Sequence, residues 1–178
     1  MTQSPYEGAL VRLRAREPGD EPLLYAWFND PEVTEHLTIR YPLSHAQETS
    51  FIDANQVNSY AKVSFAVETL ADARLIGGVG LEDTSPENRS AVLGIAIGDK
   101  AYWDGGYGTD TMRTICRFGF ESMNLHRIEL EVYAANERAI RVYEKVGFRI
   151  EARRRDAVYT RGAYQDVLMM GLLEGELR

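Results

Sequence analysis

Three glycines, at positions 105, 106 and 108, stand at the start of a helical stretch in the segment YWDGGYGTDTM, residues 102–112. The apolar stretch LGIAIG, residues 93–98, comes shortly before them. Glycines at such a junction let the backbone approach a ligand closely, and the N–H groups at a helix N-terminus attract phosphate oxygens. The pattern therefore favours a loop that binds the diphosphate of a nucleotide.

The residues around this loop distinguish the kinds of protein that bind a diphosphate. A dinucleotide fold uses G-x-G-x-x-G, with an acidic residue about 20 positions later. Gly106 and Gly108 fit the first two glycines, but position 111 is Thr. Glu129 or Glu131 would supply the acidic residue, so a nicotinamide-dependent oxidoreductase stays open. No Gly-Lys-Ser/Thr follows, which excludes a P-loop, and a turn without a ligand is the remaining alternative.

A second group of chemically useful residues lies in the segment NERAIRVYEKVGF, residues 136–148. Asn136 and Tyr143 are seven residues apart, which is two helical turns, so they lie on one face of a helix. The Tyr143 hydroxyl is a candidate acid for protonating a leaving group. A packed aromatic residue is the alternative for Tyr143, and Asn136 would cap the helix in either case.

Several carboxylates are candidates for a base or for binding a cation. Glu82, at a strand end, and Glu68 would accept a proton directly or through water, with a solvated carboxylate as the alternative for both. Asp30, Glu32 and Glu35 would form an acidic mouth for a cationic ligand, or else a cluster at a helix end with no ligand.

Hydrophobic periodicity and turn signals predict the elements that position these residues. The N-terminal third reads as one strand and two or three short helices, one of them opened by Ser44 and Gln47 in capping-box spacing. A helix follows the glycines and ends near Asn124, and another runs from Asn136 to Val146. The expected strands span 9–15, 63–70, 74–83, 90–98 and 127–132, and a hairpin turning near 160–162 closes the chain. This order, βααβββαβαββ, predicts a single α+β domain over 1–178, an antiparallel meander followed by one βαβ crossover.

Composition and charge narrow the partners. The chain has 178 residues and a net charge of −7, which argues against nucleic acid and is compatible with an amine ligand. No apolar run approaches the roughly 18 residues that span a bilayer, and the N-terminus lacks a signal-peptide pattern, so we expect a cytoplasmic protein without a membrane partner. Cys116 is the only cysteine and falls on an apolar helix face, which predicts a core residue. The three histidines are scattered, so we expect no metal.

The glycine loop, the strand before it and the 136–148 helix together resemble the GNAT superfamily of acetyl-CoA-dependent N-acetyltransferases. The matches to its loop glycines and its Asn-x-x-Ala-x-x-x-Tyr-x-x-x-Gly-Phe helix are Gly106, Gly108, Asn136, Ala139, Tyr143, Gly147 and Phe148. The aromatic pair YW before the glycines and the opening LRAREPGDEPLLYAWFNDPEV resemble the branch that acetylates N-termini of ribosomal proteins. The resemblance covers nearly the whole chain. It implies a single GNAT-like domain with a mixed, mostly antiparallel sheet of about seven strands, splayed at the acetyl-CoA site and flanked by helices.

The same resemblance implies a set of site residues. One main-chain amide among Ile95, Ala96 and Ile97 would stabilise the thioester oxyanion. Trp103 stands where the superfamily has Gln or Arg, and Val92 stands where many relatives carry a glutamate, so the base is not assigned by the resemblance. The implied catalytic residues are Tyr143 and Asn136, and Glu82, at its strand end, is added to them as the candidate base. The implied cofactor-binding residues are Ile95, Ala96, Ile97, Trp103, Gly105, Gly106, Tyr107, Gly108, Thr109, Asn136, Ala139, Tyr143 and Lys145.

The function implied is direct transfer of an acetyl group from acetyl-CoA, the co-substrate, to a primary amine, without a metal. A protein N-terminal α-amine of the ribosomal-protein type is the acceptor that the resemblance implies. Its pKa of about 7.7–8.0 leaves part of it neutral at physiological pH, so strong base catalysis is unnecessary. A polyamine, an aminoglycoside or another small amine is the alternative acceptor. A non-catalytic CoA-binding module is an alternative of another class. Relatives of this kind often pair, so a homodimer through the edge beside the C-terminal hairpin is a further expectation.

Overall fold

The computed structural model describes residues 4–178, so residues 1–3 of the expected domain lie outside the described residues. Its element order is the predicted one, with two short 3-10 helices added, η1 (Pro18–Asp20) and η2 (Lys100–Tyr102). The strands are β1 (Val11–Arg14), β2 (Val63–Thr69), β3 (Leu75–Ser85), β4 (Ser90–Ile97), β5 (Arg127–Tyr133), β6 (Arg149–Thr160) and β7 (Ala163–Leu173). The helices are α1 (Glu21–Phe28), α2 (His45–Ala54), α3 (Tyr107–Glu121) and α4 (Glu137–Val146).

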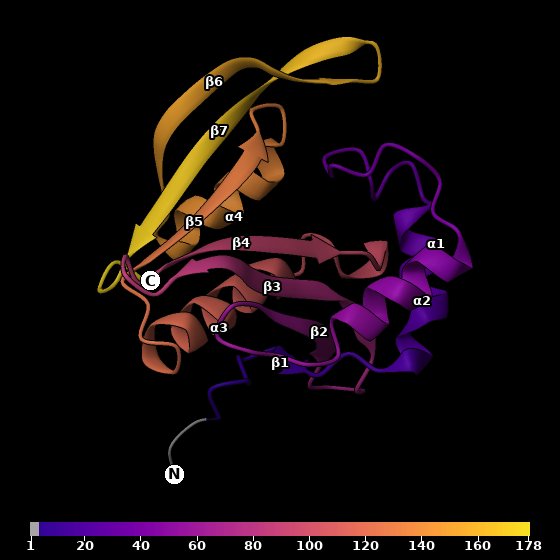
Figure 1. The fold of residues 1–178 in the computed structure, drawn as a ribbon, viewed down its shortest axis with the longest axis horizontal. Coiled ribbons are helices and arrows are strands. Elements are labelled where there is room, and N and C mark those ends of the chain that lie inside the picture. Colours follow the sequence, from indigo (N-terminus) through magenta and orange to yellow (C-terminus); the bar gives the residue numbers. More distant parts are fainter. Residues whose placement is uncertain (1–3) are drawn as a thin grey trace.

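The seven strands form one sheet in the order β1-β2-β3-β4-β5-β7-β6, and only the β4–β5 pairing is parallel (Figure 1). β4 and β5 pair only between residues 90–92 and 127–129. β3 continues to pair with β4 as far as Ile97. The second half of β4 therefore has a partner on one side only, and the predicted splay of the sheet is confirmed.

The C-terminal half departs from the expected single crossover. β5 pairs antiparallel with β7, and β7 pairs antiparallel with β6, so β5 and β6 run parallel with β7 between them. The chain thus crosses over a second time through α4. The final hairpin then turns back, which places β7 between β5 and β6. In Figure 1 this hairpin extends beyond the rest of the sheet.

The helices cover both faces of the sheet. α3 packs on β1, β3 and β5 and contacts α4, whereas α1 and α2 pack on each other (Figure 1). The apolar side of α3, with Met112, Ile115 and Cys116, is fully buried against the sheet. Cys116 is thus the core residue that its position predicts, and burial raises the pKa of its thiol.

The helix ends follow from local signals. Ser44 and Gln47 form the predicted capping box of α2. The Asn136 side chain accepts the Ala139 N–H at the start of α4, and Gly147 ends that helix with φ 118°. α3 ends at Glu121, short of Asn124, which adopts φ 57° in the turn that follows.

One carboxylate fastens the start of β1 to α3, although the two are about a hundred residues apart. Asp110, in the first turn of α3, accepts the N–H groups of Ala9, Leu10 and Val11 at 3.0, 2.7 and 3.1 Å. These three donors would otherwise need water or another acceptor.

We expect Asp110→Ala to destabilise the fold by about 2 kcal/mol, because hydrogen bonds to a charged acceptor are among the stronger ones. For a domain of this size the melting temperature should fall by about 5 °C, which a thermal melt would measure. Activity well below the melt should change little, since Asp110 lines neither cavity described below. An unchanged melting temperature would mean that water replaces the carboxylate at no cost.

Candidate active site

The glycine loop, β4 and α4 enclose a cavity of about 330 Å³, here called the loop cavity. Two of the predicted residues do not line it. Tyr107 packs its ring edge-on against Tyr102, with centroids 5.0 Å apart, and Gly105 precedes it. The predicted residues that line the cavity are Ile95, Ala96, Ile97, Trp103, Gly106, Gly108, Thr109, Asn136, Ala139, Tyr143 and Lys145.

The two glycines in the cavity wall are needed for different reasons. Gly106 has φ 87°, a left-handed conformation that residues with a Cβ adopt at a cost. Gly108 lies within α3 without a positive φ, and a Cβ there would meet only Ile97 Cγ1, at 4.0 Å. The fold therefore has no need of a glycine at 108. A glycine there instead keeps space open in front of the helix.

The first turn of α3 offers N–H groups to this space. The first bond within the helix is donated by the Asp110 N–H to the Gly106 carbonyl, at 3.0 Å. The N–H groups of residues 107–109 precede it and have no acceptor within the helix. Together with the helix dipole they favour an anion such as a diphosphate at this end.

The backbone of β4 provides a second set of free groups. The Gly98 N–H bonds to the Ile76 carbonyl, at 2.9 Å, so even-numbered residues of this stretch face β3. Ile95 and Ile97 consequently direct their main-chain groups to the splayed side, while Ala96 pairs with Gly78. The Ile97 carbonyl accepts the Trp103 indole N–H at 2.8 Å. An extended ligand could form main-chain hydrogen bonds with the remaining N–H and C=O groups of Ile95 and Ile97, as it would with the edge of a strand.

Asn136 and Tyr143 both line the cavity from α4, as their spacing predicts. The Asn136 amide oxygen is occupied by the cap, which leaves its amide nitrogen to bind a ligand. The Tyr143 hydroxyl makes no hydrogen bond within residues 4–178. Burial raises the pKa of Tyr143 to about 12, so the hydroxyl stays protonated and can donate.

Replacing Asn136 separates its two roles. We expect Asn136→Asp to keep the cap, since Asp and Asn are equivalent there, and to weaken acetyl-CoA binding about tenfold by removing the N–H donor. Asn136→Ala should also lose about 1 kcal/mol of stability with the cap. Calorimetric titration with CoA and a thermal melt would separate the two effects. Equal CoA affinity in Asn136→Asp and the wild type would leave Asn136 with the cap alone.

A cation in the loop cavity was missed from the sequence. Arg138, in the first turn of α4, places its guanidinium 4.0 Å from the centre of the Trp103 ring and lines the cavity. Stacked in this way it is a candidate partner for a phosphate. The signal available in the sequence is a positive charge two positions after Asn136, at the second residue of α4.

A second cavity, of about 460 Å³ and here called the sheet cavity, lies over β2–β4 on the face bearing Arg16, Ser64 and Gly78. The two cavities share the residues His36, Leu37, Ile95, Ala96, Asn136 and Tyr143. They therefore meet where β4 loses its partner and where the Tyr143 side chain lies. Two ligands, one in each cavity, would have their ends at this junction.

His36 belongs to both cavities and was not among the expected site residues. Its ring meets Tyr133 edge-on, with centroids 6.4 Å apart. Burial is the main cause that lowers the pKa of His36, which favours the neutral imidazole. Nothing in the local sequence marks it, because its position depends on how the segment before α2 folds over the sheet.

The expected carboxylates lie in different surroundings. Glu82 lines the sheet cavity and pairs with Lys62 at 3.2 Å. Glu68 lies outside both cavities, in bonds to Arg12 and Arg14. Burial tends to raise the pKa of Glu68, but its arginine partners outweigh this and the net direction is down.

The three acidic residues of the predicted mouth also have cationic partners. Asp30 and Glu32 hold the Lys100 ammonium at 2.8 and 2.7 Å, and Glu35 faces Arg161 at 3.8 Å. Lys100 and Arg161 thus give the three carboxylates two cationic partners, which leaves one negative charge in this group.

A sheet split between its fourth and fifth strands, a glycine-opened helix at the split and two cavities that join there define a two-substrate acyl-CoA-dependent transferase. The family model for the acetyltransferase (GNAT) domain matches residues 11–149, and the chain belongs to this family. Its activity is therefore acyl transfer from acetyl-CoA to an amine, and the predicted fold class is confirmed.

Relatives and solved structures agree on the family and differ in acceptor. The chain is 28% identical to a spermidine N(1)-acetyltransferase of Vibrio cholerae, over 93% of this chain and 94% of that protein. It is 31% identical to YdaF of Bacillus subtilis, a ribosomal N-acetyltransferase-like protein, over 60% of this chain and 58% of that one. A crystal structure of the Vibrio cholerae spermidine N-acetyltransferase with CoA and spermine superimposes with a TM-score of 0.84, at 28% identity, covering 93% of this chain and 96% of that one.

Within residues 4–178, no group of three or more His, Cys, Asp or Glu side chains is arranged to hold a metal ion. In the same part of the chain, no helix is long and apolar enough to cross a membrane.

Proposed function

We propose that the protein transfers the acetyl group of acetyl-CoA directly to the α-amine at a peptide N-terminus. The observation that carries this proposal is the junction of the two cavities at Ile95, Ala96 and Tyr143. A thioester reaching along the loop cavity and an amine reaching along the sheet cavity would meet there without an acyl-enzyme. Cys116, the only cysteine, is buried in the core and away from the junction.

The residues at the junction have separate tasks in this mechanism. The amine nitrogen forms a bond to the thioester carbonyl carbon, and a main-chain N–H of Ile95 or Ile97 stabilises the negative oxygen. The C–S bond then breaks, and Tyr143 donates its proton to the leaving thiolate. The proton lost from the nitrogen passes to a base, and the phenolate is reprotonated from solvent. The products are an N-acetyl amide and free CoA.

Glu82 remains our proposed proton acceptor, acting through water, and His36 is a second candidate from the structure. Both line the sheet cavity. An α-amine needs only a weak base, because about a third of it is already neutral near pH 7.5. An amine of pKa near 10.4 is only about 0.1% neutral there and would need a stronger base.

Charge balance supports an acceptor with a single positive charge. Within the described residues, the carboxylates lining the sheet cavity are Glu82 and Glu131, which pair with Lys62 and Arg154. Arg16 adds a positive charge to the cavity floor. A polyamine with three or four ammonium groups would find no surplus of negative charge in these residues.

A screen of acceptors tests the proposal. Release of free CoA thiol from acetyl-CoA would be measured with short peptides, spermidine and an aminoglycoside at matched concentrations. We expect the highest kcat/KM with a peptide whose N-terminus is free, and none with the same peptide blocked. CoA release that requires none of these amines, or no release at all, would contradict it.

Polyamine acetylation is the second candidate function, favoured by the similarity to the Vibrio cholerae spermidine N(1)-acetyltransferase along 93% of the chain. In the same screen it predicts spermidine as the best acceptor. That result would retain the acetyltransferase and replace its proposed acceptor.

Assembly and location are also proposals. β6 is an edge strand, and the exposed Tyr159 and Tyr164 lie at the tip of its hairpin with β7. We propose that this edge pairs two copies, and a monomer by light scattering at micromolar concentration would contradict it. The lone, buried Cys116 is compatible with the cytoplasm as the proposed location.

A further inference from the structure

An unusual group of polar atoms lies under α2, on the floor of the sheet cavity. Within residues 4–178, the buried side-chain atoms that lack a hydrogen-bond partner are Arg16 Nη1, Glu48 Oε1 and Asn55 Oδ1. Arg16 is only 7% exposed, Asn55 5% and Glu48 2%. Glu48 lies in α2 and Asn55, two turns later, caps its C-terminus, and the Arg16 guanidinium lies 5.2 Å from the centre of the Phe51 ring between them. Arg16 and Asn55 line the sheet cavity, whereas Glu48 lies behind it and does not.

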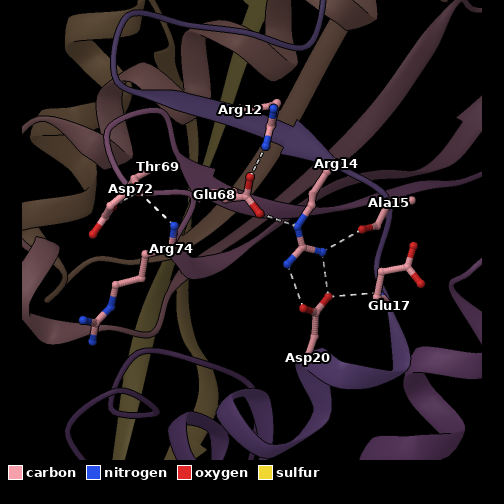
Figure 2. Close-up of polar contacts among 9 residues, drawn as sticks. All are labelled: Arg12, Arg14, Ala15, Glu17, Asp20, Glu68, Thr69, Asp72 and Arg74. Atoms are coloured by element: carbon pink, nitrogen blue, oxygen red, sulfur yellow. Dashed lines mark hydrogen bonds and ion pairs between the residues drawn. The ribbon is translucent and has the colours of Figure 1, made fainter.

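The neighbouring network fixes the backbone on both sides of Arg16. Figure 2 shows Arg14 held between Asp20 and Glu68, and Asp20 accepting the Glu17 N–H. Arg14 Nη2 lies 2.8 Å from Asp20 Oδ1, and the Glu17 N–H bond is 2.9 Å. With both neighbours held, Arg16 cannot easily move to find a partner elsewhere.

The Arg16 side chain itself is aligned by the sheet beneath it. Its Nε donates to the Ser64 hydroxyl at 2.8 Å. It lies flat over Gly78, where a Cβ would stand 2.4 Å from Nη2, so a glycine is required there for steric reasons. Burial is the main cause that lowers the pKa of Arg16, and Asp20 and Glu48 counter it. An arginine side chain keeps its charge in proteins.

This arrangement lies one strand away from the junction of the cavities. Gly78 is the register partner of Ala96, and Cα atoms of such a hydrogen-bonded pair are about 5.5 Å apart. An amine at β4 and an oxygen on Arg16 would thus be separated by a few bonds only. In a peptide, the first two carbonyls lie about one and two residue lengths from the α-amine, and each residue spans about 3.5 Å, so this separation falls within their reach.

We propose that Arg16 and Asn55 form a subsite that binds the first peptide group of the acceptor, and so select an α-amine over an alkyl amine. The peptide carbonyl accepts from Arg16 Nη1, and the peptide N–H donates to Asn55 Oδ1. A polyamine offers donors alone and cannot satisfy the Arg16 N–H. This inference rests on the proposed transfer to a peptide N-terminus and assigns the residue that determines it.

The experiment compares Arg16→Met with the wild type on alanine tripeptide and on spermidine, using the full chain. Methionine keeps the packing on Phe51 and removes the donor. We expect kcat/KM for the tripeptide to fall about 30-fold, mainly through KM, because a hydrogen bond from a charged group is lost. The rate with spermidine should stay level or rise, and the KM for acetyl-CoA should not change. Free alanine, which has a carboxylate and no peptide group, should be a poorer acceptor than the tripeptide.

Two further variants keep the test decisive. Arg12→Met makes the same change four residues earlier, at an arginine paired with Glu68 outside both cavities, and should leave all rates unchanged. Arg16→Lys covers the case in which Arg16→Met does not fold, because it keeps the charge over Glu48 and should lose tripeptide activity selectively.

Equal losses on both acceptors, or no loss in a folded variant, would mean that solvent satisfies the Arg16 N–H. A wild type that acetylates spermidine and no peptide would overturn the subsite while leaving the transferase intact, whereas absence of any transfer would overturn the proposed function itself.

Discussion

Tyr143→Phe is expected to lower kcat about 100-fold while leaving the KM for acetyl-CoA nearly unchanged. General acid catalysis typically contributes about 10²–10⁴-fold, and a thiolate leaves without much assistance, so the low end applies. The high pKa of Tyr143, about 12, keeps its proton available throughout the range in which the enzyme would be assayed. The effect should therefore be the same at pH 6 and pH 9, with no new limb in the pH–rate profile.

The structure makes this substitution a clean one. The Tyr143 hydroxyl has no hydrogen-bond partner among the described residues, and its ring packs near Phe148, with centroids 6.1 Å apart. Phenylalanine keeps that packing, so the melting temperature should stay within about 2 °C of the wild type. Tyr6→Phe is the matched control, because Tyr6 packs on Phe65 and Phe118 and lines neither cavity. Full kcat in Tyr143→Phe would assign the proton to water or another group.

The order of the elements could be predicted from the sequence because each has a strong local signal. The Ser44–Gln47 box, the Asn136 cap and Gly147 act within a few residues of the ends that they fix. The insertion of β7 between β5 and β6 has no such signal, since it depends on which strand the last hairpin pairs with. Periodicity says that a segment is a strand and which face is apolar, but it does not say which neighbour the strand takes.

The site divides in the same way. The loop-cavity residues that come from the glycine loop and from α4 could be predicted from the sequence. Gly106, Gly108, Asn136 and Tyr143 carry the family pattern. His36, Arg16 and Asn55 could not be predicted in this way, because they enter the sheet cavity from the N-terminal segments, whose positions depend on long-range contacts. Arg16 in particular looks in the sequence like one more charge in an alternating strand. Only the packing under α2 shows that its N–H is buried and unpaired.

Gly108→Val is expected to raise the KM for acetyl-CoA and the Kd for CoA about 100-fold, in a protein that folds normally. A Cβ at 108 would point into open space, with Ile97 Cγ1 at 4.0 Å as its nearest contact. That space borders the free N–H groups at the start of α3, so valine would hold a diphosphate away from them. Losing two hydrogen bonds to a charged group costs about 3 kcal/mol, which is the 100-fold effect. Calorimetric titration with CoA measures it without an acceptor.

Gly106→Ala provides the contrast that makes the prediction specific. At φ 87° an alanine is strained, so this variant should lose about 1–2 kcal/mol of stability. Gly108→Val should instead match or slightly exceed the wild type in a thermal melt, because valine has a higher helix propensity than glycine. Gly19→Val, at an exposed glycine with no atom within 4 Å of its Cβ position, controls for the substitution itself. Normal CoA affinity in folded Gly108→Val would mean that the diphosphate does not approach the backbone here, and the assignment of the loop cavity to acetyl-CoA would have to be withdrawn.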